Sequence, residues 1–151
     1  MKNFVDAAGR VWVVDVNVAT IKRVRSLAGV NLLEVVEGDL IERLSGDPVL
    51  LADVLYAVCQ PQATRDNISD EQFGEGLAGD VISLATTAML DSLVAFFPEP
   101  RRRLLEKAAA KYRQVQDKAL AMIEAKLESP QLENRILRQL DRELTLQESS
   151  G

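Results

Sequence analysis

Acidic side chains form the densest group of potential metal ligands in the chain. Asp66, Asp70, Glu71 and Glu75 lie close together in the sequence, and carboxylates are the ligands that divalent cations such as Ca²⁺ prefer. The group lacks the spacing of a calcium-binding loop, which has a central glycine and a terminal glutamate. Negative charge also suits the start of a helix, because it complements the helix dipole. The favoured interpretation is therefore a solvated loop and helix start.

Histidine is absent from the 151 residues, so the commonest general base and the commonest metal ligand are both missing. The one cysteine, Cys59, lies in an apolar run, where a buried, unreactive thiol is the simplest interpretation. The sequence has neither a glycine-rich phosphate loop nor a nucleophile elbow. These residues predict a protein that is not an enzyme and that holds no metal or cofactor.

The densest basic group begins at Arg101–Arg103 and continues with Lys107, Lys111 and Arg113 along one predicted helix. A phosphate-binding stripe would use such residues. Acidic residues interrupt the group and few aromatic residues are available to stack on bases, so solvated side chains are the favoured interpretation. The net charge of -5 also opposes a general affinity for nucleic acid or for acidic membranes.

Residues 4–18 are the one stretch that reads as β-structure. Two apolar runs flank the turn signal at residues 6–9, where Gly9 supplies the left-handed conformation that a short hairpin loop requires. Side chains alternate along a strand, so the second strand has two apolar faces, one with Trp12, Val14 and Val16 and the other with Val11 and Val13. We expect the first face to pack on helices and the second to contact another copy of the chain or a partner. Lysine at both Val11 and Val13 is then expected to leave a folded monomer.

Apolar periodicity predicts helices over most of the remaining chain. They cover residues 17–29, 39–46, 48–59, 69–77, 80–97 and 101–129, with a single turn at 31–36 and a final run at 132–144. Pro61 and the polar residues after it predict a loop at 60–70. The predicted fold is mainly α: a helical bundle with an N-terminal β-hairpin and a long C-terminal helix or helical hairpin.

Three Gly-Asp pairs separate these helices, at residues 38–39, 46–47 and 79–80. In each pair we expect glycine to end one segment in the left-handed conformation and aspartate to cap the next helix. Asp39 with Glu42 has the spacing of a capping box, and Asp47 precedes Pro48 at a first helical position.

The composition changes near Pro98, which suggests a compact hairpin and helix domain at residues 2–98 and an extended helical region at 99–148. Whether the second region packs on the first is left open. Its first helix carries a coiled-coil-like seam, formed by Leu105, Ala108, Tyr112, Val115, Ala119 and Met122. After Pro130, a run with Leu132, Ile136 or Leu137, Leu140 and Leu144 either folds back onto this seam or leaves it for another molecule.

The longest apolar stretches are too short and too polar to cross a bilayer, which takes about 18 to 20 apolar residues. The first residues also lack the apolar core of a signal peptide. We therefore expect a soluble, intracellular protein.

The order of these signals resembles small proteins of bacteriophage and prophage tail cassettes, of the tail assembly chaperone type. The resemblance spans about residues 2–110 and is carried by the runs "GRVWVVDV", "TIKRVRSLAGVNLLE", "GDLIERLSGDPVLLADVLYAVCQPQA", "SDEQFGEGLAGD" and "LVAFFPEPRRRLLEKAA". It implies a mainly helical protein of the host cytoplasm that binds the long, helical tape measure protein during tail assembly and forms homo-oligomers. It implies no catalytic residues.

The expected partner-binding residues are Val11, Val13, Leu105, Tyr112, Val115 and Met122. The expected partners are the tape measure or another tail protein and further copies of the chain, without nucleic acid or membrane. A structural protein that stays in the particle, such as a head-tail connector or a minor tail component, is the alternative reading, together with a more general helical interaction module.

Overall fold

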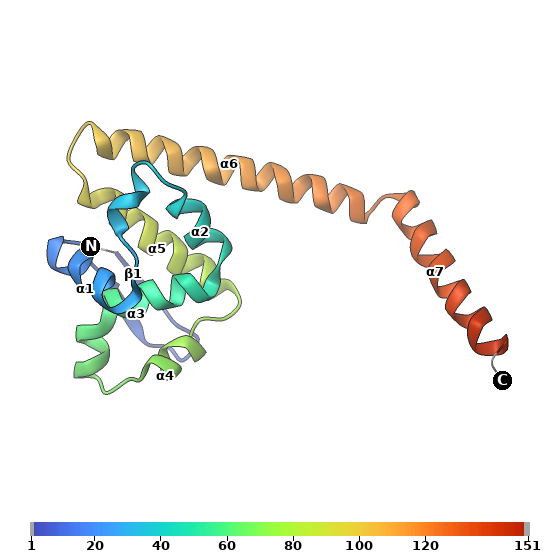
Figure 1. Cartoon of the computed structure of the whole chain (residues 1–151), viewed down its shortest axis with the longest axis horizontal. Coiled ribbons are helices and arrows are strands. Elements are labelled where there is room, and N and C mark those ends of the chain that lie inside the picture. Colours follow the sequence, from blue (N-terminus) through green and yellow to red (C-terminus); the bar gives the residue numbers. More distant parts are fainter. Residues whose placement is uncertain (1, 150–151) are drawn as a thin grey trace. The chain divides into compact units, whose positions relative to one another are not determined.

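Helices and one hairpin make up the structure, as the sequence predicts (Figure 1). The computed structural model describes residues 2–149. The elements are β1 (Lys2–Val5), β2 (Val11–Val14), α1 (Val18–Ala28), the 3-10 helix η1 (Leu32–Val35), α2 (Leu40–Gly46), α3 (Pro48–Arg65), α4 (Asp70–Glu75), α5 (Asp80–Phe96), α6 (Arg101–Leu127) and α7 (Pro130–Ser149). Among the described residues, none of the helices has the length and apolar character that a membrane span needs.

The chain divides into two units, which comprise residues 1–109 (unit 1) and 110–151 (unit 2). Unit 1 holds the hairpin, the helices up to α5 and the first turns of α6. It continues past the change of composition at Pro98 because Leu105 belongs to its hydrophobic core and Ala109 is buried as well. Unit 2 holds the rest of α6 and all of α7.

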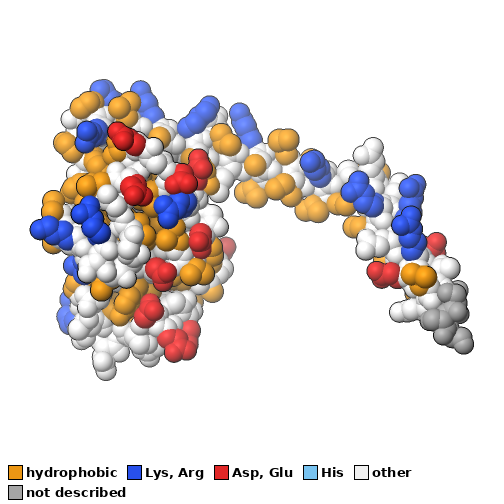
Figure 2. All heavy atoms as spheres, in the orientation of Figure 1, with side chains coloured by type: hydrophobic (Ala, Val, Ile, Leu, Met, Phe, Trp, Pro, Cys, Tyr) orange, Lys and Arg blue, Asp and Glu red, His pale blue; other side chains and the backbone are white. Residues whose placement is uncertain are grey.

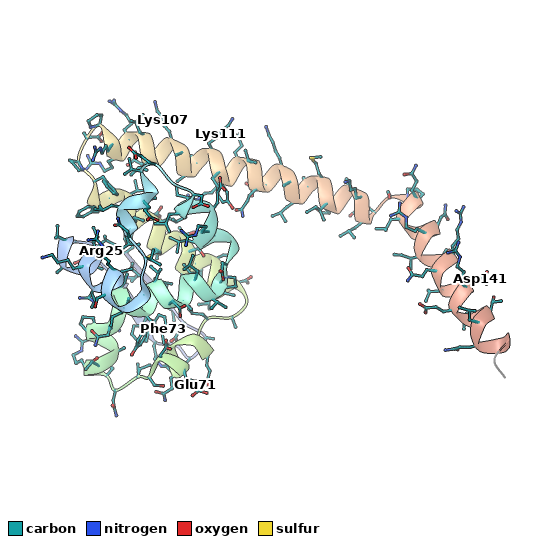
Figure 3. All side chains as sticks on the ribbon, viewed as in Figure 1. Arg25, Glu71, Phe73, Lys107, Lys111 and Asp141 are labelled. Carbon is teal, nitrogen blue, oxygen red and sulfur yellow. The ribbon has the colours of Figure 1, made fainter. Side chains whose placement is uncertain are left out.

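The core of unit 1 is built on one face of the hairpin. β1 and β2 pair antiparallel, with Phe4 opposite Trp12 and Lys2 opposite Val14. α5 packs mainly against β1, and α3 packs against β2. The side chains of Trp12 and Val14 are completely buried, and Trp12 meets the ring of Phe73 from α4 edge-on, with ring centroids 4.8 Å apart. Figure 3 shows Phe73 within the body of this unit.

The central helix α3 runs to Arg65, so the predicted loop at residues 60–70 is wrong in its first half. Pro61 lies inside the helix and has no N–H to donate to the carbonyl of Ala57 one turn earlier. Arg23 from α1 supplies the missing donor: its Nε donates to the Ala57 carbonyl at 2.7 Å. A terminal guanidinium nitrogen of Arg23 also donates to the next carbonyl, that of Val58, at 2.9 Å. A distant arginine therefore allows the helix to continue through the proline.

Of the three Gly-Asp pairs, one forms the predicted aspartate cap. The carboxylate of Asp47 accepts the N–H groups of Val49 and Leu50, and Pro48 begins α3. Asp39 makes no side-chain cap and instead lies 3.9 Å from Arg43 in an ion pair. Asp80 is the first residue of α5 rather than its cap. Only Gly79 among the three glycines takes a positive φ, of 59°.

Candidate interaction surface

The outer face of the hairpin is an exposed apolar surface. Val5, Val11 and Val13 are 48%, 53% and 41% exposed, whereas Trp12 and Val14 on the opposite face are completely buried. The predicted division of the second strand into a core face and an outward face is therefore confirmed. The structure does not test whether another molecule contacts Val11 and Val13, so that contact stays a prediction.

A buried carboxylate fixes the hairpin turn beneath this face. Oδ1 of Asp6 accepts the N–H groups of Ala8 and Arg10, each at 2.9 Å, and Oδ2 accepts the indole N–H of Trp12 at 2.9 Å. The guanidinium of Arg10 lies 3.4 Å from Oδ2. One side chain thus joins the turn to the core aromatic, because its two oxygens accept from several donors at once.

Close packing behind Asp6 explains a glycine in the segment after α4. A methyl group at Gly76 would lie 2.7 Å from Oδ2 of Asp6, and the Gly76 carbonyl accepts the N–H of Ala7 at 2.9 Å. The backbone at Gly76 therefore approaches the turn more closely than any side chain would permit. The sequence alone does not predict this contact, because the two positions are far apart in the chain.

Side chains of α3 close the outer edge of β2. The amide of Gln62 accepts the Val13 N–H at 3.2 Å and donates to the Val11 carbonyl at 2.7 Å. The thiol of Cys59 donates to the Val13 carbonyl at 3.7 Å. These bonds replace those of a third strand, so the outer backbone edge of β2 is satisfied while Val11 and Val13 point outward.

The side chain of Cys59 is a free thiol, and it is buried, as predicted. Burial raises the pKa of this thiol from its ordinary value of 9.0 to about 12, although the nearby positive charge of Arg23 acts in the opposite direction. The thiol is therefore protonated near neutral pH, and it serves the hairpin edge as a hydrogen-bond donor.

The predicted seam of α6 divides between the two units. Leu105 is 5% exposed and belongs to the unit 1 core, so its side chain already has its contacts within the chain. Tyr112 is half-buried, whereas Val115 and Met122 are 54% and 65% exposed. The available part of the seam thus begins near Tyr112.

Unit 2 presents an apolar stripe on each of its helices. Figure 2 shows the apolar side chains along α6. Here the α6 stripe means Val115, Ala119, Met122, Ile123 and Leu127, and the α7 stripe means Leu132, Ile136, Leu137, Leu140 and Leu144. Within each stripe the residues recur at three- and four-residue spacings, which places them on one side of a helix. The large apolar side chains of both stripes are half or more exposed, apart from Leu132, which is intermediate.

The acidic and basic groups singled out in the sequence do not come together as a chemical site. Asp66, Asp70 and Glu71 are exposed, and Figure 3 shows Glu71 on α4 pointing outward. Asp66 pairs with Arg65 at 3.3 Å. Arg102 pairs with Glu99 at 3.1 Å at the start of α6. Within the part of the chain that the structure describes, no three His, Cys, Asp or Glu side chains are grouped so as to hold a metal ion.

A groove of about 510 Å³ opens in unit 1 between η1 and the start of α6. Leu33, Val36 and Phe97 provide apolar lining, and Glu34, Glu37 and Arg101 provide charges. No pattern in the sequence predicts this groove, because its two sides are brought together only by the fold.

The chain matches no protein-family model, no curated protein and no solved structure.

Proposed function

We propose that this protein is a non-enzymatic assembly factor that binds a helical partner through unit 2. The observation that carries the proposal is the pair of apolar stripes, whose side chains remain exposed along α6 and α7. Exposed apolar surface of this extent marks interaction sites in soluble proteins. Amphipathic helices recognise other helices by burying such stripes against a matching stripe or groove.

The resemblance to tail assembly chaperones supplies the specific form of the proposal. In that form the partner is the tape measure protein, a long helical protein with amphipathic stripes of its own, and binding occurs in the host cytoplasm. The hairpin supports it with a second surface, because Gln62 hydrogen-bonds the backbone of Val11 and Val13, and Asp6 hydrogen-bonds the turn and Trp12. We propose that Val11 and Val13 contact a neighbouring copy while unit 2 engages the partner.

Co-expression with a tail gene cassette tests this function. The tagged chain is purified, and the proteins that accompany it are identified by mass spectrometry. We expect a very long helical protein of the tape measure type. Aspartate in place of both Val115 and Met122 should abolish its recovery, because charges cannot be buried unpaired in an apolar contact.

The matched control is Gln114→Asp, which adds the same type of charge on the opposite side of α6. It should leave recovery unchanged. If the control loses the partner as well, general charge repulsion rather than the α6 stripe is responsible. Recovery of tube or connector proteins in fixed stoichiometry, without a tape measure protein, would instead establish the structural-protein alternative.

A further inference from the structure

The two stripes of unit 2 carry opposite charges, one charge within each stripe and one at its border. Lys126 interrupts the α6 stripe and Lys118 lies at its border, one turn from Met122. Glu133 interrupts the α7 stripe and Glu143 lies at its border, beside Leu144. The arginines of α7, in contrast, lie on the side away from its stripe, at positions 135, 138 and 142. The α6 stripe is therefore lined by positive charge and the α7 stripe by negative charge.

These charges decide which stripes fit together. Two α6 stripes in contact would bring the lysines of one chain, Lys118 and Lys126, close to the lysines of the second chain. Two α7 stripes in contact would likewise bring Glu133 and Glu143 of one chain close to the glutamates of the other. Like charges at such borders are unfavourable, whereas opposite charges favour pairing. Lys118, Lys126, Glu133 and Glu143 are all exposed, and none forms an ion pair with another of the described residues. The complement of an α6 stripe is thus an α7 stripe.

One antiparallel register satisfies both stripes at once. Its facing residues along the seam are Val115 with Leu144, Ala119 with Leu140 and Met122 with Leu137. The same register places Lys126 opposite Glu133. Lys118 and Glu143 each lie at the border of their stripe, directly before the seam residues Ala119 and Leu144. In an antiparallel helix pair such border positions lie on the same side of the seam, so Lys118 lies beside Glu143.

We propose that α7 of one copy packs antiparallel on α6 of a second copy in this register, and α6 on α7 in return. The register is symmetric about the connection between the helices, at Ser129 and Pro130, so a two-fold axis there generates both contacts. A second copy is the occupant because the single chain leaves both stripes exposed. Unit 2 also has no charge barrier to self-association, since its 7 basic and 7 acidic residues, counted from Ala110 to Gly151, balance.

This pairing adds a form of regulation to the proposed function. The pairing itself does not depend on that function, but its effect on partner binding does. In the free protein each stripe is occupied by another copy, and a partner helix binds by displacing that copy. Self-association and partner binding then compete for the same apolar surface, so the protein releases its stripes only to a partner that binds them more tightly.

Charge reversal tests the pairing with the protein alone, by sedimentation equilibrium. The native chain should be a dimer or a multiple of dimers. Lys118→Glu and Glu143→Lys should each weaken dimerisation about tenfold, because the pair occurs twice per dimer and exposed ion pairs are weak individually. The double variant should restore the native dissociation constant. Arg138→Glu, on the opposite side of α7, is the control and should change nothing.

Disulfide trapping identifies the occupant. In a Cys59→Ala background, cysteines replace Ala119 and Leu140, which face each other in the register. Oxidation should give a covalent dimer on a non-reducing gel, and cysteines at Ala121 and Leu140 should not, because Ala121 lies away from the stripe. An intramolecular link in a monomer would overturn the proposal in favour of a helical hairpin within one chain. The absence of any link would overturn the register.

Both tests are independent of any partner. Fluorescence of Trp12, the only tryptophan, reports whether unit 1 of each variant is folded. A dimer that fails to recover a tape measure protein refutes the proposed function and leaves the pairing intact. A monomer that recovers it refutes the pairing alone.

Discussion

The interaction between Arg23 and the interrupted helix α3 predicts an energetic coupling between Arg23 and Pro61. Replacing Arg23 with alanine removes the donors to the carbonyls of Ala57 and Val58, at 2.7 and 2.9 Å. In the native chain the Ala57 carbonyl has no helical N–H to replace the lost bond, because residue 61 is proline. When residue 61 is alanine, its N–H forms that bond.

Hydrogen bonds to charged groups contribute about 1.5–3 kcal/mol, and an unsatisfied buried carbonyl costs about 1–3 kcal/mol. Arg23 is partly exposed, so the lower half of this range applies. We expect Arg23→Ala to reduce the free energy of unfolding by about 2 kcal/mol in the native chain and by about 1 kcal/mol in Pro61→Ala. The coupling energy is then about 1 kcal/mol.

Urea denaturation of the four chains, followed by the fluorescence of Trp12, measures the cycle. Trp12 is completely buried in the core against which α3 packs, so its emission reports the unfolding of unit 1. Lys22→Ala serves as the control, since Lys22 is exposed on the same helix. It should change the free energy of unfolding by less than about 0.5 kcal/mol.

Equal losses from Arg23→Ala in both backgrounds, within about 0.3 kcal/mol, would refute this explanation of the tolerated proline. Pro61→Ala should itself stabilise the chain, because an interior proline is unfavourable in a helix. A destabilised Pro61→Ala variant would show that the proline has a packing role that the hydrogen bonds do not explain.

Three further variants test the hairpin. Gly76→Ala should reduce the free energy of unfolding by about 1–3 kcal/mol, since its methyl group displaces Asp6, and urea denaturation measures the loss. Above pH 9 the unfolded chain loses the Cys59 proton that the folded chain keeps up to about pH 12, so stability should fall by up to about 1.4 kcal/mol per pH unit over that window. Cys59→Ala should remove that part of the slope, and an unchanged slope contradicts the burial of the thiol. Lysine at both Val11 and Val13 should leave the melting temperature within about 3 °C of the native value, because both side chains are exposed. The same variant should lose any contact between copies that the hairpin face makes, and sedimentation measures the resulting mass. An unchanged mass would exclude the hairpin face as a contact between copies.

Local patterns determined the type and approximate position of most elements. The alternation around Trp12 predicts a buried face and an outward face, and the structure confirms both, because strand periodicity fixes side-chain direction without reference to other elements. The cap at Asp47 is equally local, since the bonded N–H groups lie within one helical turn. The spacing along α7 likewise predicts an amphipathic helix from the sequence alone.

The tertiary structure decided what depends on residues that are distant in sequence. Pro61 reads as a helix breaker, and only the approach of Arg23 from α1 allows α3 to continue. The closure of the β2 edge by Gln62 and the fit of Gly76 behind Asp6 likewise join positions that no periodicity relates. Leu105 looked available to a partner because periodicity identifies an apolar face but not what covers it. The sequence thus determined which surfaces are apolar, while packing decided which of them are buried, since burial depends on how the rest of the chain is arranged around each surface.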